Sequence, residues 1–162
     1  IADPDFSIDE MGICNYYYEY NKMVKEELPG SPQREIELER LINKIKQEGK
    51  RNKYDCITGV SGGVDSSYLI LLAKKWKLRT LIVHFDNGWN TEIAVKNINN
   101  IIKSTGFDLY TIVVNWEEFR DLQLAYIKSG VVDLEVPSDH AICATWYRLA
   151  KKYNIKTIEQ YA

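Results

Sequence analysis

The chain has 162 residues, of which 45% are hydrophobic and 27% charged, as is typical of one globular domain with a substantial core. Its formal net charge of -2 provides no positive field to collect nucleic acid through phosphates, so a nucleic acid partner is not expected. No apolar run approaches the roughly 20 residues that span a bilayer, and the start lacks a signal-peptide pattern, so we expect a cytoplasmic protein without a membrane partner.

The first 32 residues read as a turn-rich, aromatic entry segment without a core strand, ended by the breaker cluster at residues 29–32. A domain spanning 33–162 follows. It opens with a helix predicted over 33–47, because apolar residues recur there at helical spacing among charged ones: Ile36, Leu38, Leu41, Ile42 and Ile45.

Strands and helices alternate from residue 54 onward. The predicted strands cover 54–60, 80–85, 110–114 and 155–158, and the predicted helices cover 68–75, 91–104, 116–128 and 139–153. This alternation predicts an α/β fold with a parallel sheet covered by helices on both faces. A loop after Ile158 would normally form one wall of the ligand site, so we expect a domain truncated at its C-terminus.

The three cysteines are Cys14, Cys56 and Cys143. No two of them have the short spacing that lets a metal collect paired thiolates, so we expect neither a disulfide framework nor a complete zinc site. Cys56, in a strand-like run, and Cys143, on a predicted helix, are expected to be buried free thiols.

The clearest chemical signal is the run Ser61-Gly62-Gly63-Val64-Asp65-Ser66-Ser67, between a predicted strand and a predicted helix. Glycines allow close approach of backbone N–H groups to phosphate, serine hydroxyls add donors, and the N-terminus of the following helix favours negative charge. The run lacks the lysine of a Walker A loop, so transfer of a γ-phosphate is not indicated. The carboxylate of Asp65 would repel phosphate unless Mg²⁺ bridges them, so the run predicts a pyrophosphate site that uses Mg²⁺.

This run resembles the signature of the PP-loop ATP pyrophosphatases, which cleave ATP to AMP and pyrophosphate. The resemblance implies an adenine nucleotide alpha hydrolase-like, Rossmann-like fold, and nominates Ser61, Gly62, Gly63, Val64, Asp65, Ser66 and Ser67 as ATP-binding residues. It places Phe85 and Asp86, after the second strand, near the nucleotide, with Asp65 and Asp86 as metal ligands. An ordinary turn at Asn87-Gly88 is an equally good interpretation of that second segment.

A closer resemblance covers most of the chain. Asp3-Pro4-Asp5, Gly12-Ile13-Cys14-Asn15, the run at Ser61, residues 85–92 and residues 135–141 are together similar to the N-acetyl sugar amidotransferases of surface-polysaccharide (lipopolysaccharide O-antigen) biosynthesis. The resemblance implies an ATP-dependent enzyme that adenylates the acetamido oxygen of a nucleotide-linked N-acetyl sugar. Ammonia from a partner glutaminase would then give an acetamidino sugar.

The chain departs from this family at two places. Tyr17 stands where the family has a second cysteine, which again argues against zinc. Residues 159–162 do not match the Thr-Glu loop that completes the family's nucleotide pocket.

Asp139 and His140 follow Pro137 and complete, with Asp65 and Ser66, the candidate catalytic set. They would orient the sugar or relay a proton from ammonia, as acid–base catalysis requires. An equally good interpretation is that Ser138 or Asp139 caps the helix and that His140 is a surface residue in its first turn. His84, inside a predicted strand, is expected in the core.

Two other functions remain open. One is a different PP-loop enzyme, resembling GMP or NAD synthetases or a tRNA-thiolating enzyme, although near-neutral charge and the lack of a cysteine pair disfavour thiolation. The other is a module that senses ATP or AMP without turnover.

Overall fold

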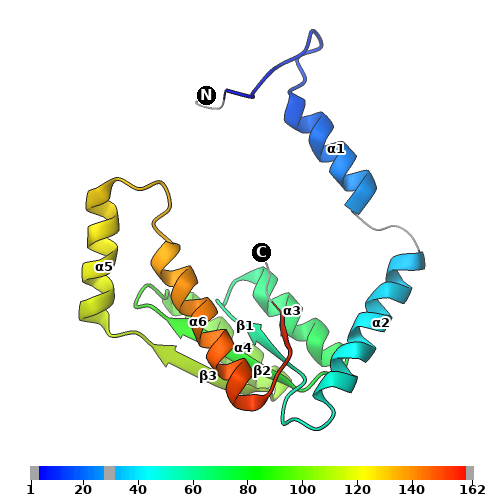
Figure 1. Cartoon of the computed structure of the whole chain (residues 1–162), viewed down its shortest axis with the longest axis vertical. Coiled ribbons are helices and arrows are strands. Elements are labelled where there is room, and N and C mark those ends of the chain that lie inside the picture. Colours follow the sequence, from blue (N-terminus) through cyan, green and yellow to red (C-terminus); the bar gives the residue numbers. More distant parts are fainter. Residues whose placement is uncertain (1–3, 28–31, 160–162) are drawn as a thin grey trace. The chain divides into compact units, whose positions relative to one another are not determined.

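A computed structural model describes residues 4–27 and 32–159 of the chain (Figure 1). The chain divides into two compact units, residues 1–41 and 42–162. The division falls within helix α2 (Pro32–Gly49), whereas the boundary predicted from sequence lies at the start of this helix.

The first unit holds a turn followed by a helix. The Asp9 carboxylate accepts hydrogen bonds from the backbone N–H groups of Met11 and Ile13, both at 2.9 Å, and Ile8 pairs with Cys14. Helix α1 (Asn15–Glu27) then begins, a helix that the prediction of a turn-rich entry segment over residues 1–32 did not include. The physical reason is that no glycine or proline interrupts the chain from residue 13 to residue 28. The predicted breaker cluster at 29–32 falls mostly on residues 28–31, which lie outside the described residues.

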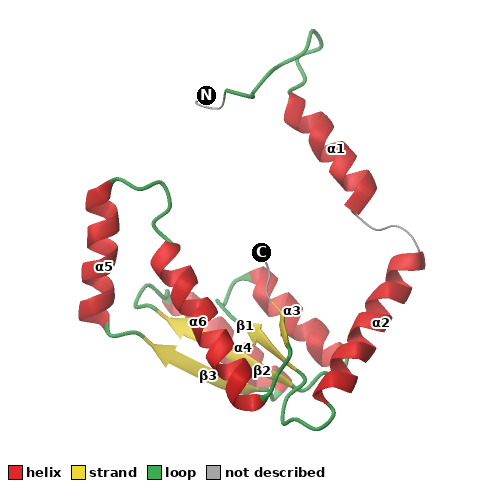
Figure 2. Ribbon diagram, viewed as in Figure 1, coloured by secondary structure: helices red, strands yellow, loops and turns green. Residues whose placement is uncertain are grey.

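The second unit is built on a four-stranded sheet (Figure 2). Its strands are β1 (Cys56–Gly59), β2 (Thr80–Asp86), β3 (Asp108–Val113) and β4 (Thr157–Glu159). All pairs are parallel and the order is β3-β2-β1-β4. The predicted parallel sheet is therefore confirmed, with strand ends shifted by a few residues.

Helices cover both faces of this sheet, as predicted. The helices that follow β1 are α3 (Val64–Lys75), α4 (Glu92–Thr105), α5 (Trp116–Ser129) and α6 (Val136–Tyr153), and of these α3, α4 and α6 contribute core residues that pack on the strands. On one face, Trp146 and Leu149 of α6 pack with Ile57, Leu81 and Val83, and Figure 1 shows α6 crossing the strands. On the other face lie Cys56 of β1 and Ile82 of β2, whose neighbours Ile57, Leu81 and Val83 lie on the first face. Cys56 and Ile82 pack with residues of α2, α3 and α4: Ile42, Ile45, Ile70, Ala73, Ile98 and Ile101. Among the described helices, none is long and apolar enough to cross a membrane.

Two helices begin earlier than the sequence predicted. Helix α3 starts at Val64 rather than Tyr68, since Gly63 already has the extended backbone of a residue preceding a helix (φ -77°, ψ 171°). Helix α6 starts at Val136 rather than Asp139, because the fixed φ of Pro137 suits a first turn, where its missing N–H leaves no bond unmade. Ser138 and Asp139 are therefore inside the helix and do not cap it.

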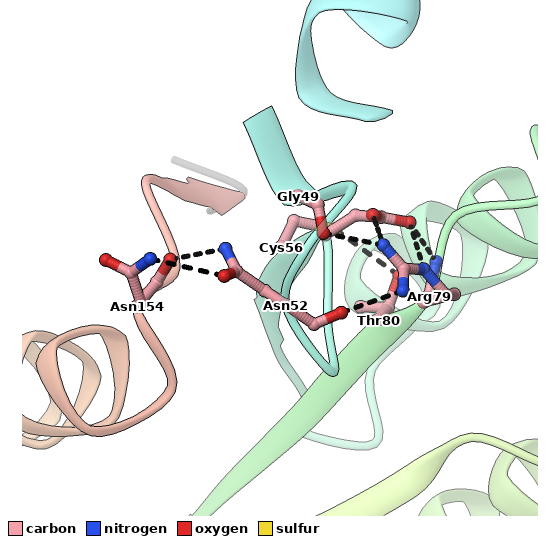
Figure 3. A network of polar contacts seen from close by, with 7 residues as sticks. Gly49, Asn52, Cys56, Arg79, Thr80 and Asn154 are labelled. Atoms are coloured by element: carbon pink, nitrogen blue, oxygen red, sulfur yellow. Dashed lines mark hydrogen bonds and ion pairs between the residues drawn. The ribbon is translucent and has the colours of Figure 1, made fainter. Parts of the chain in front are cut away.

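The edge of the sheet where β1 and β2 begin is cross-linked by Arg79 (Figure 3). Its guanidinium pairs with the Asp55 carboxylate, which is only 4% exposed, and donates to the carbonyls of Gly49 at 2.7 Å and Asn52 at 2.8 Å. The Asn52 amide donates to the Asn154 carbonyl at 2.6 Å, which ties in the end of α6. These bonds fix the amino ends of β1 and β2, and the ligand site of a parallel sheet lies at the opposite, carboxyl ends of its strands.

Candidate functional site

A cleft of about 520 Å³ opens at the carboxyl ends of β1 and β2. Parallel sheets place ligands at this edge, and the volume falls within the range of small-molecule sites. Its lining comes from the β1 end and the following loop, from the β2 end and its loop, and from the start of α6: Gly59, Val60, Ser61, Ser66, Val83, His84, Phe85, Asn87, Asn90, Glu135, Ser138, Asp139, Ile142, Cys143 and Trp146.

Gly62 sets the shape of the loop between β1 and α3. Its φ is +82°, a region that side chains disfavour, and a Cβ would come within 2.5 Å of the Ala94 carbonyl oxygen on α4. The Asn97 side-chain amide donates to the Gly62 carbonyl at 3.0 Å and so holds that carbonyl toward α4. Because N–H and C=O point in opposite directions across a trans peptide, the Gly63 N–H is turned away from α4.

The serines of this loop bond to each other only weakly. Ser61 Oγ and Ser66 Oγ are 3.2 Å apart, and the Ser61 N–H donates to Ser66 Oγ at 3.3 Å. Both distances are long for their type of bond, so a phosphate oxygen readily replaces these contacts. The backbone N–H groups of Val64 and Asp65, in the first turn of α3, have no acceptor within the helix. Hydroxyls, N–H groups without an acceptor and a helix N-terminus are the groups from which anion sites are built.

The other loop residues nominated from sequence lie on the α4 side. Ser67 Oγ donates to the Gly63 carbonyl at 2.7 Å, a strong bond that closes the first turn of α3. Gly62, Gly63, Val64 and Ser67 line a separate shallow cavity against α4. Ser61 and Ser66 are thus the loop residues that line the main cleft.

At the end of β2, a chain of hydrogen bonds orients Asp86. His84 is buried, as predicted, and its Nδ1 lies 3.0 Å from the Val60 carbonyl, which only accepts, so Nδ1 carries the proton. The Nε2 atom then accepts from the Asn90 amide at 3.3 Å. The same amide donates to Asp86 Oδ1 at 2.8 Å, and the Gly88 N–H donates there at 3.0 Å. One carboxylate oxygen of Asp86 is held, and the other has no hydrogen bond to a described residue.

These carboxylates are compatible with Mg²⁺ bound together with a nucleotide. Asp65 is exposed in the first turn of α3, and Asp86 is half-buried at the β2 end beside the cleft. Within the described ranges there is no group of three His, Cys, Asp or Glu side chains suited to holding a metal alone. Magnesium on a nucleotide needs only one or two carboxylates, because phosphate oxygens and water complete its coordination.

The start of α6 forms the opposite wall. Asp139 lines the cleft, whereas His140 is exposed and is not among the lining residues. Ser138 is only 2% exposed, and its hydroxyl has no hydrogen-bond partner among the described residues. Such a hydroxyl is uncommon in a folded protein and calls for a bound ligand or water.

The two cysteines of this unit, Cys56 and Cys143, differ in their exposure to solvent. Cys56 is buried as predicted, and burial raises the pKa of its thiol to about 12, so it stays protonated and inert. Cys143 is exposed and lines the cleft, so the prediction that it is buried is wrong. Its turn of α6 lies over the cleft, where no strand packs against it.

The sequence predicted no role for Asn97 or Asn90, and it indicated Ser138 only as a possible helix cap. The contacts of Asn97 depend on which face of α4 packs against the loop at Gly62, and no local pattern specifies that. Asn90 was noted only within the family resemblance, without a role.

No protein-family model matches the sequence, and no curated protein matches it either. Among solved structures, the fold is similar to the NH3-dependent NAD synthetase from Campylobacter jejuni subsp. jejuni NCTC 11168 in complex with the nitrate ion (TM-score 0.54, 15% identity, 74% of this chain and 52% of that chain). It is also similar to the NMN synthetase from Francisella tularensis (TM-score 0.52, 20% identity, 74% of this chain and 50% of that chain). The chain thus spans about half the length of these two proteins and shares its α/β fold with them.

Proposed function

We propose that this chain is the ATP-binding part of a PP-loop ligase, which transfers AMP to an acceptor oxygen and releases pyrophosphate. The observation that carries the proposal is the loop from Ser61 to Ser66. It combines weakly bonded hydroxyls of Ser61 and Ser66 at the cleft with N–H groups in the first turn of α3 that have no acceptor within the helix. Two synthetases with this fold, one of them NH3-dependent by name, support a reaction in which nitrogen is added after activation.

The proposed acceptor is the acetamido group of a nucleotide-linked N-acetyl sugar. Its amide oxygen attacks the α-phosphorus of ATP, the bond from phosphorus to the bridging oxygen breaks, and pyrophosphate leaves. Ammonia then forms a bond to the amide carbon, the bond from carbon to oxygen breaks, and AMP leaves with that oxygen. One proton is released, and the product is an acetamidino sugar. A partner glutaminase would supply the ammonia, and we place the reaction in the cytoplasm.

Individual residues take the following roles in this proposal. Ser61 and Ser66, with the N–H groups of residues 62–66, hold the pyrophosphate. Asp65 and Asp86 would hold Mg²⁺, which would neutralise phosphate charge when bound. Of the pair Asp139 and His140, we assign the proton relay to Asp139, since it lines the cleft and His140 does not.

The second candidate is a reaction of the NAD synthetase type, with an acceptor carboxylate in place of the amide. The fold comparison favours this candidate. The charge of the cleft favours the sugar, because its described lining includes the carboxylates of Glu135 and Asp139 and contains no lysine or arginine. An acceptor carboxylate at the reacting position would meet repulsion there, whereas an acetamido group carries no charge.

Isotope exchange between pyrophosphate and ATP tests the proposal. The full-length enzyme, with its ammonia source, is assayed with UDP-N-acetylglucosamine and with deamido-NAD as separate acceptors. Exchange that depends on the sugar, together with a product in which NH replaces one oxygen by mass spectrometry, is the expected result. Exchange that depends only on deamido-NAD would favour the second candidate, and binding of AMP without exchange under any condition would indicate a nucleotide sensor.

A further inference from the structure

A second cavity of about 460 Å³ adjoins the cleft. Asn87, Asn90 and Glu135 line both spaces, so a molecule in one reaches the border of the other. The remaining lining comes from the loop after β2, from α5 and from the segment before α6: Trp89, Gln123, Ile127 and Leu134.

Trp89 is exposed in this cavity and yet held in one orientation. Its side chain is 63% exposed, while its Nε1–H donates to Gln123 Oε1 at 2.7 Å. The Trp116 ring packs edge-on against it, with ring centres 5.6 Å apart at 74°. Gly88, at φ +83°, makes this arrangement possible, because a Cβ there would lie 2.8 Å from the Trp116 ring. A large aromatic ring that is fixed but uncovered is typical of a recognition surface.

Several polar groups around the ring have unused hydrogen-bonding capacity. Gln123 and Asn87 each use the amide oxygen, toward Trp89 Nε1 and the Trp89 N–H, and their amide nitrogens bond to no other described residue. Asn90 uses its amide nitrogen, which leaves its oxygen as an acceptor. The Glu135 carboxylate has no ion-pair or hydrogen-bond partner among the described residues. The cavity therefore offers both donors and acceptors, which is what hydroxyl groups require.

We propose that this second cavity is the acceptor subsite and that it binds a neutral, hydroxylated, acetamido-bearing sugar ring. The apolar C–H face of the ring lies on Trp89, the hydroxyls bond to the amides and to Glu135, and the acetamido methyl contacts Ile127 and Leu134. The amide oxygen then points to the border at Asn87 and Asn90, beyond which the α-phosphate of ATP lies in the main cleft. This assignment rests on the proposed function, and it identifies Trp89 and Gln123 as residues that determine specificity.

The charge of the cavity selects against other acceptors. Glu135 is its one charged lining residue among those described, and it is negative. A nicotinate ring carries a carboxylate at its reacting end, which would meet repulsion and find no cation among these lining residues. A sugar ring has no charge and uses both the donors and the acceptors.

Steady-state kinetics of pyrophosphate–ATP exchange with the full-length enzyme test the subsite, with UDP-N-acetylglucosamine and deamido-NAD as probes. For Trp89→Ala we expect the KM for the sugar nucleotide to rise about tenfold or more, as for loss of a stacking aromatic, with the KM for ATP unchanged. Trp89→Phe keeps an aromatic face and restores part of the affinity. Tyr147→Ala is the matched control, because Tyr147 is an aromatic residue of the same unit, 71% exposed, outside the lining of both cavities.

The outcomes separate the subsite from the proposed function. If the sugar nucleotide supports exchange and Trp89→Ala has wild-type kinetics, the subsite is wrong and the proposed function stands. If only deamido-NAD supports exchange and Trp89→Ala raises its KM, the sugar assignment and the proposed function both fail. A rise in the KM for ATP as large as that for the sugar also overturns the subsite, because Trp89 would then act on the cleft.

Discussion

The two neighbouring glycines of the loop at Ser61 provide a matched pair of variants that separates folding from ligand binding. In Gly62→Ala the new Cβ would lie 2.5 Å from the Ala94 carbonyl oxygen and 2.8 Å from Ala94 Cα, and the residue would keep a φ of +82°. The unfavourable φ costs about 1–2 kcal/mol and the overpacking about 1–3 kcal/mol. We therefore expect a loss of about 3 kcal/mol in the free energy of unfolding, equivalent to a fall in Tm of about 6–12 °C.

Gly63→Ala should behave differently. Gly63 has a φ of -77°, which alanine accepts, and the nearest atom to its Cβ would be Ser61 Oγ at 3.4 Å, an ordinary contact. Alanine is a poorer residue than glycine before a helix but loses less entropy on folding, so stability should stay within about 1 kcal/mol of wild type. The methyl group would occupy the space through which phosphate approaches the backbone, so we expect pyrophosphate affinity to fall about tenfold or more.

Thermal denaturation followed by circular dichroism measures the stability of both variants, and isothermal titration calorimetry measures their binding of pyrophosphate and ATP. Wild-type affinity in Gly63→Ala would show that the Gly63 backbone takes no part in phosphate binding. A wild-type Tm for Gly62→Ala would show that the loop does not approach α4 as described.

Three further variants or reagents test other parts of the structure. Arg79→Ala leaves the buried carboxylate of Asp55 without its cation and should lower the free energy of unfolding, measured by chemical denaturation, by about 3 kcal/mol. A loss below about 1 kcal/mol would contradict the structural role given to the Arg79–Asp55 ion pair. The hydrogen bond from Tyr54, at 2.6 Å, lowers the pKa of Asp108. The ionised carboxylate therefore stabilises the fold fully at pH values above the pKa of an unfolded aspartate, about 4, and this stabilisation is lost as the pH falls through the folded pKa. Asp108→Asn should therefore lower stability at neutral pH by less than about 1 kcal/mol, since the group is exposed, and a deficit that persists at acid pH would refute this linkage. A maleimide should modify Cys143 in the native protein, with saturating ATP slowing the reaction, and an unchanged rate with ATP would place the nucleotide elsewhere.

The sequence predicted the sheet and its covering helices because each element carries its own periodic pattern. It predicted the loop at Ser61 because glycines, hydroxyls and the following helix are contiguous in the chain. Helix α1 was not predicted because its tyrosine-rich run has no apolar stripe of the kind that faces a core. The starts of α3 and α6 were misplaced because Gly63 and Pro137 read as breakers, although each suits a helix start.

What the sequence left open depends on contacts between distant segments. The bond from Asn97 to the Gly62 carbonyl joins residues 35 positions apart, and the bond from Trp89 to Gln123 joins residues 34 apart. Neither position has a distinctive local pattern. The proximity of Asp139 to the cleft, and the position of His140 outside its lining, follow from where α6 begins, which the sequence placed three residues too late.

Amide NMR of the ¹⁵N-labelled protein during titration with pyrophosphate and Mg²⁺ tests the phosphate site most directly. We expect saturable shifts for the backbone amides of residues 61–66, with smaller changes at the β2 end and little change along the edge held by Arg79. Saturable shifts confined to other segments, or amides in this loop that stay unchanged at saturating ligand, would contradict the assignment of the loop as the cradle for the leaving diphosphate.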